Sequence, residues 1–172
     1  MADTQEIQKP QFNPVVILQT GESEYTVSLA LDKLTCMDSV SRALTVWLIK
    51  RKETETILLD IHNSAVPKYT NFESIITIIN AINLCKAKTT AVVGKIYDDL
   101  SVYAILAADE LKFTPYGMLQ FLPKTPPQPD SSEAAAMSFA YDLLDRAQAR
   151  GYLSEMDVEF IKSGKTVVKY PN

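Results

Sequence analysis

Hydrophobic residues along the chain alternate between short apolar runs and runs with helical spacing, a pattern typical of strands connected by helices. Residues 57–61 form a short apolar run after a charged stretch, which predicts a strand buried on both faces. Residues 72–84 carry apolar side chains at helical intervals, which predicts a helix with one face in the core. Similar apolar runs predict strands at residues 15–18, 25–29, 89–93, 111–114 and 118–122.

Helices are predicted in the intervals between these strands. Asp38 is a suitable N-cap for a helix over residues 39–50, and Asp98 and Asp99 open another helix after Gly94. Parallel neighbouring strands follow from this order, because right-handed crossover connections between such strands need a covering helix. The predicted fold class is therefore α/β.

A proline-rich segment divides the chain near its C-terminus. Residues 124–132 hold three prolines within four positions, which excludes a helix or a central strand and predicts a linker. An alanine-rich helix over residues 133–150 follows and ends at Gly151, then a helix at 155–163 and a strand at 166–169. The long helix has an apolar stripe that needs a surface, either a neighbouring subunit or the protein's own sheet. The stripe consists of Met137, Tyr141, Leu144 and Ala147.

The composition predicts one compact domain, because 172 residues with 47% apolar side chains suffice for a single core. The 17 basic and 21 acidic residues give a formal charge of −4, which argues against binding to nucleic acid. No apolar run reaches the length of a membrane span, and the N-terminus lacks the pattern of a secretory signal. Two cysteines, Cys36 and Cys85, indicate reduced thiols, so we expect a cytoplasmic protein without membrane contact.

The single histidine, His62, limits the chemistry that the chain can perform. It directly follows a predicted strand, where a hydrogen-bonded loop residue is a more frequent role than a catalytic one. As a general base it would need a nucleophile within hydrogen-bonding reach. Ser64 is very close in sequence, and Ser101 lies on the next helix. One histidine also argues against a histidine-based metal site.

Two adjacent carboxylates, Asp98 and Asp99, allow two interpretations. Paired carboxylates can perform acid–base chemistry, but both residues fall in the first turn of a predicted helix. The helix dipole lowers a carboxylate pKa there, so helix capping is the preferred interpretation. No second acidic cluster supports a divalent-metal site. The five glycines form no phosphate-binding loop, and we expect neither a metal nor a cofactor.

Residues 92–113 contain a strand that ends at Gly94, a helix that starts four residues later, an alanine-containing turn, a basic residue and Phe113. This order and spacing resemble the proteolytic subunit of the Clp protease (ClpP), in which the nucleophilic serine lies four residues after the glycine. Residues 59–66 are similar to the strand and oxyanion loop of that family. The predicted long helix resembles its handle helix, and residues 151–168 resemble the C-termini of phage-type members.

The resemblance covers roughly residues 15–169 and implies a ClpP/crotonase-like α/β fold, built from repeated β-β-α units with a protruding handle helix. It also implies a division of the chain into five parts. These are a flexible N-terminal segment (1–14), an α/β core (15–123), a proline-rich linker (124–132), the handle helix (133–150) and a C-terminal helix and strand that complete the core (151–172).

The catalytic residues of that family do not carry over to this chain. Asp98 stands at the position of the nucleophilic serine, and Phe121 and Leu122 stand where the family has its histidine. Thr166 stands at the position of the third, acidic residue. Valine and proline at residues 66–67 replace the glycine pair of the oxyanion loop, and proline has no N–H to donate.

The resemblance therefore implies a catalytically inactive, phage-like pseudo-protease subunit that acts through ring assembly and protein binding. It implies homo-oligomeric rings of six or seven subunits, with a double ring joined through the handle helices as an option. Met137, Tyr141, Leu144 and Ala147 would then lie in the contact between rings. A Clp unfoldase or a host protease is the implied partner.

Two alternatives remain open. An active ATP-dependent Clp-type serine endopeptidase would use Ser101 or Ser64 as a relocated nucleophile, with His62 as its base. An acyl-CoA enzyme on the same framework would need two backbone N–H donors around the thioester oxygen, which Val66 and Pro67 disfavour.

Overall fold

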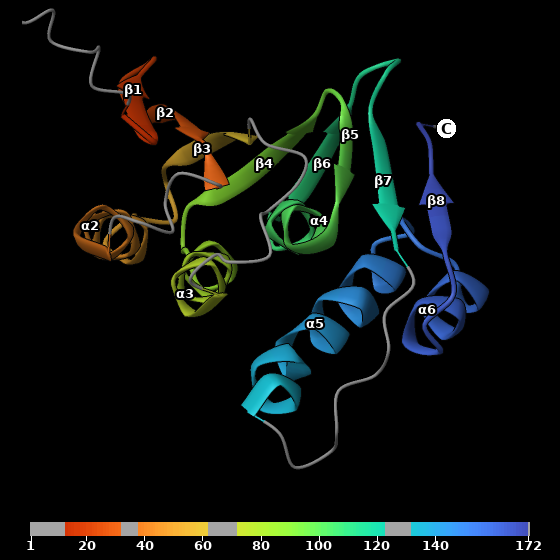
Figure 1. The fold of residues 1–172 in the computed structure, drawn as a ribbon. Coiled ribbons are helices and arrows are strands. Elements are labelled where there is room, and N and C mark those ends of the chain that lie inside the picture. The colour runs from red at the N-terminus through yellow and green to blue at the C-terminus, as the bar shows by residue number, and fades with distance from the viewer. Residues whose placement is uncertain (1–12, 32–37, 62–71, 123–131, 172) are drawn as a thin grey trace, which may run out of the picture.

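The computed structural model describes residues 13–31, 38–61, 72–122 and 132–171 (Figure 1). In chain order the elements are β1 (Val15–Gln19), β2 (Glu24–Leu29), α2 (Asp38–Ile49), β3 (Thr56–Ile61), α3 (Phe72–Asn83), β4 (Lys88–Val93), β5 (Ile96–Asp98), α4 (Asp99–Leu106), β6 (Glu110–Phe113), β7 (Met118–Phe121), α5 (Ser132–Ala149), α6 (Glu155–Lys162) and β8 (Val167–Lys169). Within these residues, no helix combines the length and the hydropathy that crossing a membrane requires.

The strands form two sheets. The five-stranded sheet has the order β1-β2-β3-β4-β6, in which β1 is antiparallel to β2 and the other neighbours are parallel. The three-stranded sheet has the order β5-β7-β8, in which β5 is parallel to β7 and β8 is antiparallel to it. Helices α2, α3 and α4 lie between successive parallel strands of the larger sheet, which confirms the predicted α/β class.

The core lies between the five-stranded sheet and helices α2, α3 and α4, which cover one of its faces (Figure 1). Strand β3 shows the consequence: Ile57, Leu59 and Ile61 are buried, whereas Leu58 on the opposite face is 38% exposed. Asp60 on that face is half-buried. The prediction that residues 57–61 are buried on both faces is therefore wrong, because the described helices cover one face only.

Strand β5 is absent from the sequence-based prediction. Its three residues directly precede α4, and they show no apolar run, because Ile96 is exposed and Tyr97 is the buried side chain that the structure describes among them. Asp98 ends this strand and Asp99 begins α4, so the predicted helix starts one residue later than expected. The other predicted elements agree with the observed ones to within two residues at each end.

The two sheets are joined at the turn between β6 and β7. The Thr114 N–H donates to the Val93 carbonyl (3.0 Å), and the Met118 N–H donates to the Lys95 carbonyl (2.9 Å). Gly117 packs so closely in this turn that a Cβ atom would lie 1.9 Å from the Val93 carbonyl oxygen. Only glycine fits there, and this close approach holds β7 beside β5.

Helix α5 ends at Ala149, and Gly151, the predicted stop, follows with a φ of 79°. The Gly151 N–H donates to the Gln148 carbonyl and the Tyr152 N–H donates to the Ala147 carbonyl, both at 2.9 Å, and together they close the last turn. After α6, β8 pairs with β7. Residues 1–12 of the predicted N-terminal segment and residues 124–131 of the predicted linker lie outside the described residues.

Candidate functional site at the end of the three-stranded sheet

Three positions singled out from the sequence meet at one end of the three-stranded sheet. Asp98 ends β5 and pairs in register with Gln120 of β7. Phe121 ends β7 and pairs with Val167, the first residue of β8. Thr166 directly precedes β8. Figure 1 shows β5 and β7 ending, and β8 beginning, at this same end of the sheet, so three segments distant in sequence converge there.

An aromatic side chain occupies the middle of these positions. Phe121 is 4% exposed, and its ring lies edge-on to the ring of Tyr103, with 6.4 Å between the centroids. Leu122 is exposed, and so is Thr166. The side chain of Asp98 lies outside the described part of the structure. A phenylalanine accepts no proton, so the position between Asp98 and Thr166 cannot supply a general base.

Tyr97, next to Asp98, ties this site to the larger sheet. Its side chain is 2% exposed, and its hydroxyl donates to the carbonyl of Ile61 at the end of β3 (2.8 Å). The same hydroxyl lies 3.4 Å from the Val92 carbonyl in β4. Burial, and secondly the charge of Asp60, raise the pKa of Tyr97 to about 12. Tyr97 is therefore a neutral, fixed donor, a role that no sequence pattern indicated.

The alternative nucleophile Ser101 lies on α4 and is 0% exposed. A nucleophile must meet the substrate carbonyl, and a fully buried hydroxyl on a core helix is closed to it. The proposed base, His62, lies outside the described residues, as do Ser64, Val66 and Pro67. The burial of Ser101 disfavours the active alternative that uses it.

The apolar stripe of α5 faces the protein's own core along part of its length. Leu144 is 0% exposed and Ala147 is 3% exposed, whereas Tyr141 is 44% exposed with the Lys162 ammonium 5.5 Å from its ring centroid. The side chain of Met137 lies outside the described part. Leu144 and Ala147 therefore pack within the chain's own core, where α5 covers α4, whose residues 101–106 are all buried. The contact between rings stays a prediction, and Tyr141 is the stripe residue whose described side chain is exposed.

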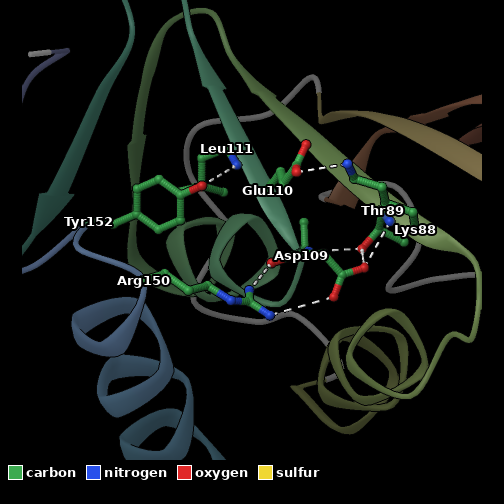
Figure 2. A network of polar contacts seen from close by, with 8 residues as sticks. Lys88, Thr89, Asp109, Glu110, Leu111, Arg150 and Tyr152 are labelled. Carbon is green, nitrogen blue, oxygen red and sulfur yellow. Dashed lines mark hydrogen bonds and ion pairs between the residues drawn. The ribbon is translucent and has the colours of Figure 1, made fainter.

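A polar network lies elsewhere, at the amino ends of β4 and β6 (Figure 2). The backbone N–H and the hydroxyl of Thr89 both donate to Oδ2 of Asp109 at 2.9 Å, and the Asp109 N–H donates to that hydroxyl at 3.0 Å. Arg150 donates to the Ala108 carbonyl at 2.6 Å and lies 3.5 Å from Oδ1 of Asp109. Arg146 lies in the last turn of α5, and burial, and secondly the positive charge of Arg150, lower the pKa of its guanidinium.

This network joins the end of α5 to the turn between α4 and β6, a structural role that sequence spacing could not reveal. Figure 2 also shows Lys88 paired with Glu110 (2.8 Å) and the Leu111 N–H donating to the Tyr152 hydroxyl (3.1 Å). The charged side chains of this network pair with one another. In the described part of the chain, no group of three potential metal ligands lies together.

Comparison with solved structures identifies the fold of the chain. Neither a protein-family model nor a curated protein matches the chain. Among solved structures, it is similar to the enoyl-CoA hydratase from Mycobacterium smegmatis, with a TM-score of 0.59 and 13% identity over 91% of this chain and 65% of that one. It is also similar to the enoyl-CoA hydratase from Bacillus anthracis, with a TM-score of 0.55 and 9% identity over 91% and 65% of the two chains.

A third similar structure is an enoyl-CoA hydratase/isomerase family protein from Silicibacter pomeroyi, with a TM-score of 0.56 and 12% identity over 90% and 68%. The chain spans about two thirds of the length of these structures. The chain therefore has the crotonase-like α/β fold. Identities this low show the fold alone, because one fold hosts many unrelated activities.

Proposed function

We propose that this chain is a catalytically inactive, ClpP-like subunit, a pseudo-protease that acts through assembly and protein binding. One observation carries the proposal: the positions that the resemblance equates with a catalytic triad meet at one end of the three-stranded sheet. Asp98, Phe121 and Thr166 occupy these positions. The common location supports the resemblance to the Clp proteolytic subunit, and the residues found there support the loss of peptidase chemistry.

The residue chemistry explains why activity would be lost. A serine peptidase needs a base that takes the hydroxyl proton and an acid that orients the base. Phe121 provides no proton acceptor, and its ring is buried beside Tyr103. Replacing one residue could not restore the mechanism, because all three positions differ from the required types.

Incubation of the purified protein with unfolded casein and short fluorogenic peptides, alone and with a Clp unfoldase, tests this proposal. We expect no turnover and no labelling by a fluorophosphonate, while an active Clp peptidase run in parallel cleaves the same substrates. Robust cleavage that serine-directed reagents abolish would contradict the proposal. In that case His62→Ala, Ser64→Ala and Ser101→Ala identify the relocated site, since the alternative of an active endopeptidase depends on these side chains.

The proposed assembly is a homo-oligomeric ring of six or seven subunits, single or double, that engages a Clp unfoldase or a host protease. The exposed ring of Tyr141 on α5 supports a contact through this helix, because large aromatic side chains are favoured in protein interfaces. Native mass measurement tests the ring directly. A multiple of six or seven subunits is expected, and a monomer would refute ring assembly.

The names of the similar structures suggest a different ligand class, acyl-CoA, that the same protein sample can test. Crotonase-like chemistry on a thioester needs paired N–H donors for its oxygen, and Pro67 lacks one. We expect coenzyme A and acetyl-CoA to leave the thermal midpoint unchanged. A concentration-dependent rise in the midpoint would favour an acyl-CoA protein over the pseudo-protease.

A further inference from the structure

The five-stranded sheet has two edges, β1 and β6, and the chain protects only one of them in its described part. At β6, the outward N–H of Leu111 donates to the Tyr152 hydroxyl at 3.1 Å. Glu110 and Lys112 on this strand are exposed and charged. Edge strands are normally protected from pairing with other chains by such covering groups and charges. Strand β6 therefore has the features of an edge that stays unpaired.

Strand β1 has the opposite features. Its sequence, VVILQ, contains no charge and no proline, and Val16, Ile17 and Leu18 are 40%, 37% and 56% exposed. Among the strands that the structure describes, β1 pairs with β2 alone. An apolar, uncharged edge strand is a template for another strand, and leaving it in water carries a risk of aggregation.

The hydrogen-bond pattern shows which groups β1 presents to a new strand. The Ala30 N–H donates to the Pro14 carbonyl and the Thr20 N–H donates to the Glu24 carbonyl, both at 2.9 Å, so residues 14 and 20 point their backbone groups toward β2. Because these directions alternate in an antiparallel pair, Ile17 and Gln19 point their N–H and carbonyl groups outward. The centre of the strand is thus free to pair.

An apolar groove runs along the same edge. It has a volume of about 410 Å³, lies between β1 and α2, and is lined by Val15, Ile17, Val40 and Trp47 among others. The side chain of Ile17 belongs to this groove, while Val16 and Leu18 lie on the opposite face of the strand. A strand added at β1 would therefore meet apolar side chains on both faces of the sheet.

We propose that the occupant of this edge is β1 of a second copy of the chain, paired antiparallel about a two-fold axis at Ile17. In this register Ile17 faces Ile17 of the second copy, and Val16 faces Leu18 of the second copy. The pairing is self-complementary because the strand carries no charge, so no like charges oppose one another. A charged partner strand would find no counter-charge on β1, which favours the second copy as the occupant.

The proposed pairing joins two five-stranded sheets into one and does not depend on the pseudo-protease function. A stable dimer buries roughly 800 Å² per partner, more than five edge residues supply. The groove adds to this area in the proposed dimer, because the two-fold axis brings α2 of each copy, with Val40 and Trp47, to the new junction. This contact is isologous, whereas a ring of six or seven subunits uses a heterologous contact. The two assemblies can therefore fail or succeed separately.

Charged substitutions of Ile17, the residue at the proposed two-fold axis, test the pairing. Ile17→Lys and Ile17→Glu each place like charges opposite one another, whereas a mixture of the two variants places opposite charges there. The wild-type mass is expected to be an even multiple of 19.2 kDa, and the mass of each variant half of it. The mixture is expected to regain the wild-type mass. Leu84→Lys, at a 68% exposed leucine outside the groove, is the matched control and should leave the mass unchanged.

A second variant keeps the test independent of these charges. Residues in a hydrogen-bonded antiparallel pair have Cα atoms about 5.5 Å apart, within the range of a disulfide. Ile17→Cys is expected to form a covalent dimer on mild oxidation, and the wild type, with its own two cysteines, is not. A wild-type monomer, a mass unaffected by Ile17→Lys and Ile17→Glu, or a mixture that stays at half mass would each overturn the proposal.

Discussion

The carboxyl ends of β5 and β7 differ from the amino ends of β4 and β6 in the kind of side chain that holds them together. At the carboxyl ends of β5 and β7, where the family resemblance would have catalytic groups, Phe121 packs against Tyr103. At the amino ends of β4 and β6, Asp109, Thr89 and Arg150 form a network of hydrogen bonds and an ion pair (Figure 2). The polar side chains of this network therefore join segments of the chain, whereas at the other end the buried Phe121 is part of the core.

Phe121→Ala is expected to have the largest effect on stability and tests whether the Phe121 ring is part of the core. If the ring is part of the core, its removal costs about 3–5 kcal/mol of unfolding free energy, because a buried aromatic leaves a cavity beside Tyr103. Urea unfolding followed by circular dichroism measures the change. Tyr116→Ala, at a tyrosine that is 84% exposed, is the matched control and should change little. A small loss at Phe121 would mean that this end is adaptable and suited to binding.

Asp109→Ala tests the other end. The substitution removes the acceptor of two hydrogen bonds from Thr89 and the counter-charge of Arg150. We expect a loss of about 1–2 kcal/mol, in the lower part of the range for unsatisfied polar groups because the Asp109 side chain is 42% exposed. Asp142→Ala, on the exposed surface of α5, is the control. Equal, small losses for both variants would show that the network does not join α5 to the sheet.

The limits of the sequence-based prediction follow from this comparison. Periodic patterns and short apolar runs located most helices and strands, whose lengths range from 3 to 18 residues. The family resemblance singled out Asp98, Phe121 and Thr166, and strand register brings these positions to one end. The exposure of Leu58 and the burial of Leu144 depend on which face a helix covers, and an apolar residue alone does not indicate that.

The polar contacts were beyond the reach of the sequence for a related reason. Asp109 bonds to Thr89 twenty positions away, and Arg150 bonds to Ala108 across 42 positions. Such pairs carry no local spacing signal, since only the completed topology brings them together. The same holds for Tyr97, because its hydroxyl donates to the carbonyl of Ile61, 36 positions earlier in the chain.

Tyr97→Phe tests the contribution of a single hydrogen bond at the junction of the two sheets. Loss of the hydroxyl removes the hydrogen bond to Ile61 and should cost about 1 kcal/mol at neutral pH. The pKa of Tyr97 is raised from 10.0 to about 12, so its protonated form is favoured in the folded state. Stability from this group is therefore complete below pH 10 and is lost as the pH rises towards 12. Unfolding titrations from pH 8 to 12 should show a steeper decline for the wild type than for Tyr97→Phe.

The smallest effect is expected within the polar network itself, at its exposed rim. Lys88 and Glu110 form an ion pair at 2.8 Å, but their side chains are 56% and 52% exposed. The carboxylate of Glu110 raises the pKa of Lys88, first through its hydrogen bond and secondly through its charge. Solvent and salt screen such contacts, so Lys88→Ala should leave the urea midpoint unchanged where Asp109→Ala lowers it. A loss at Lys88 as large as that at Asp109 would show that the whole network acts as one unit, because removing an isolated surface ion pair cannot have that effect.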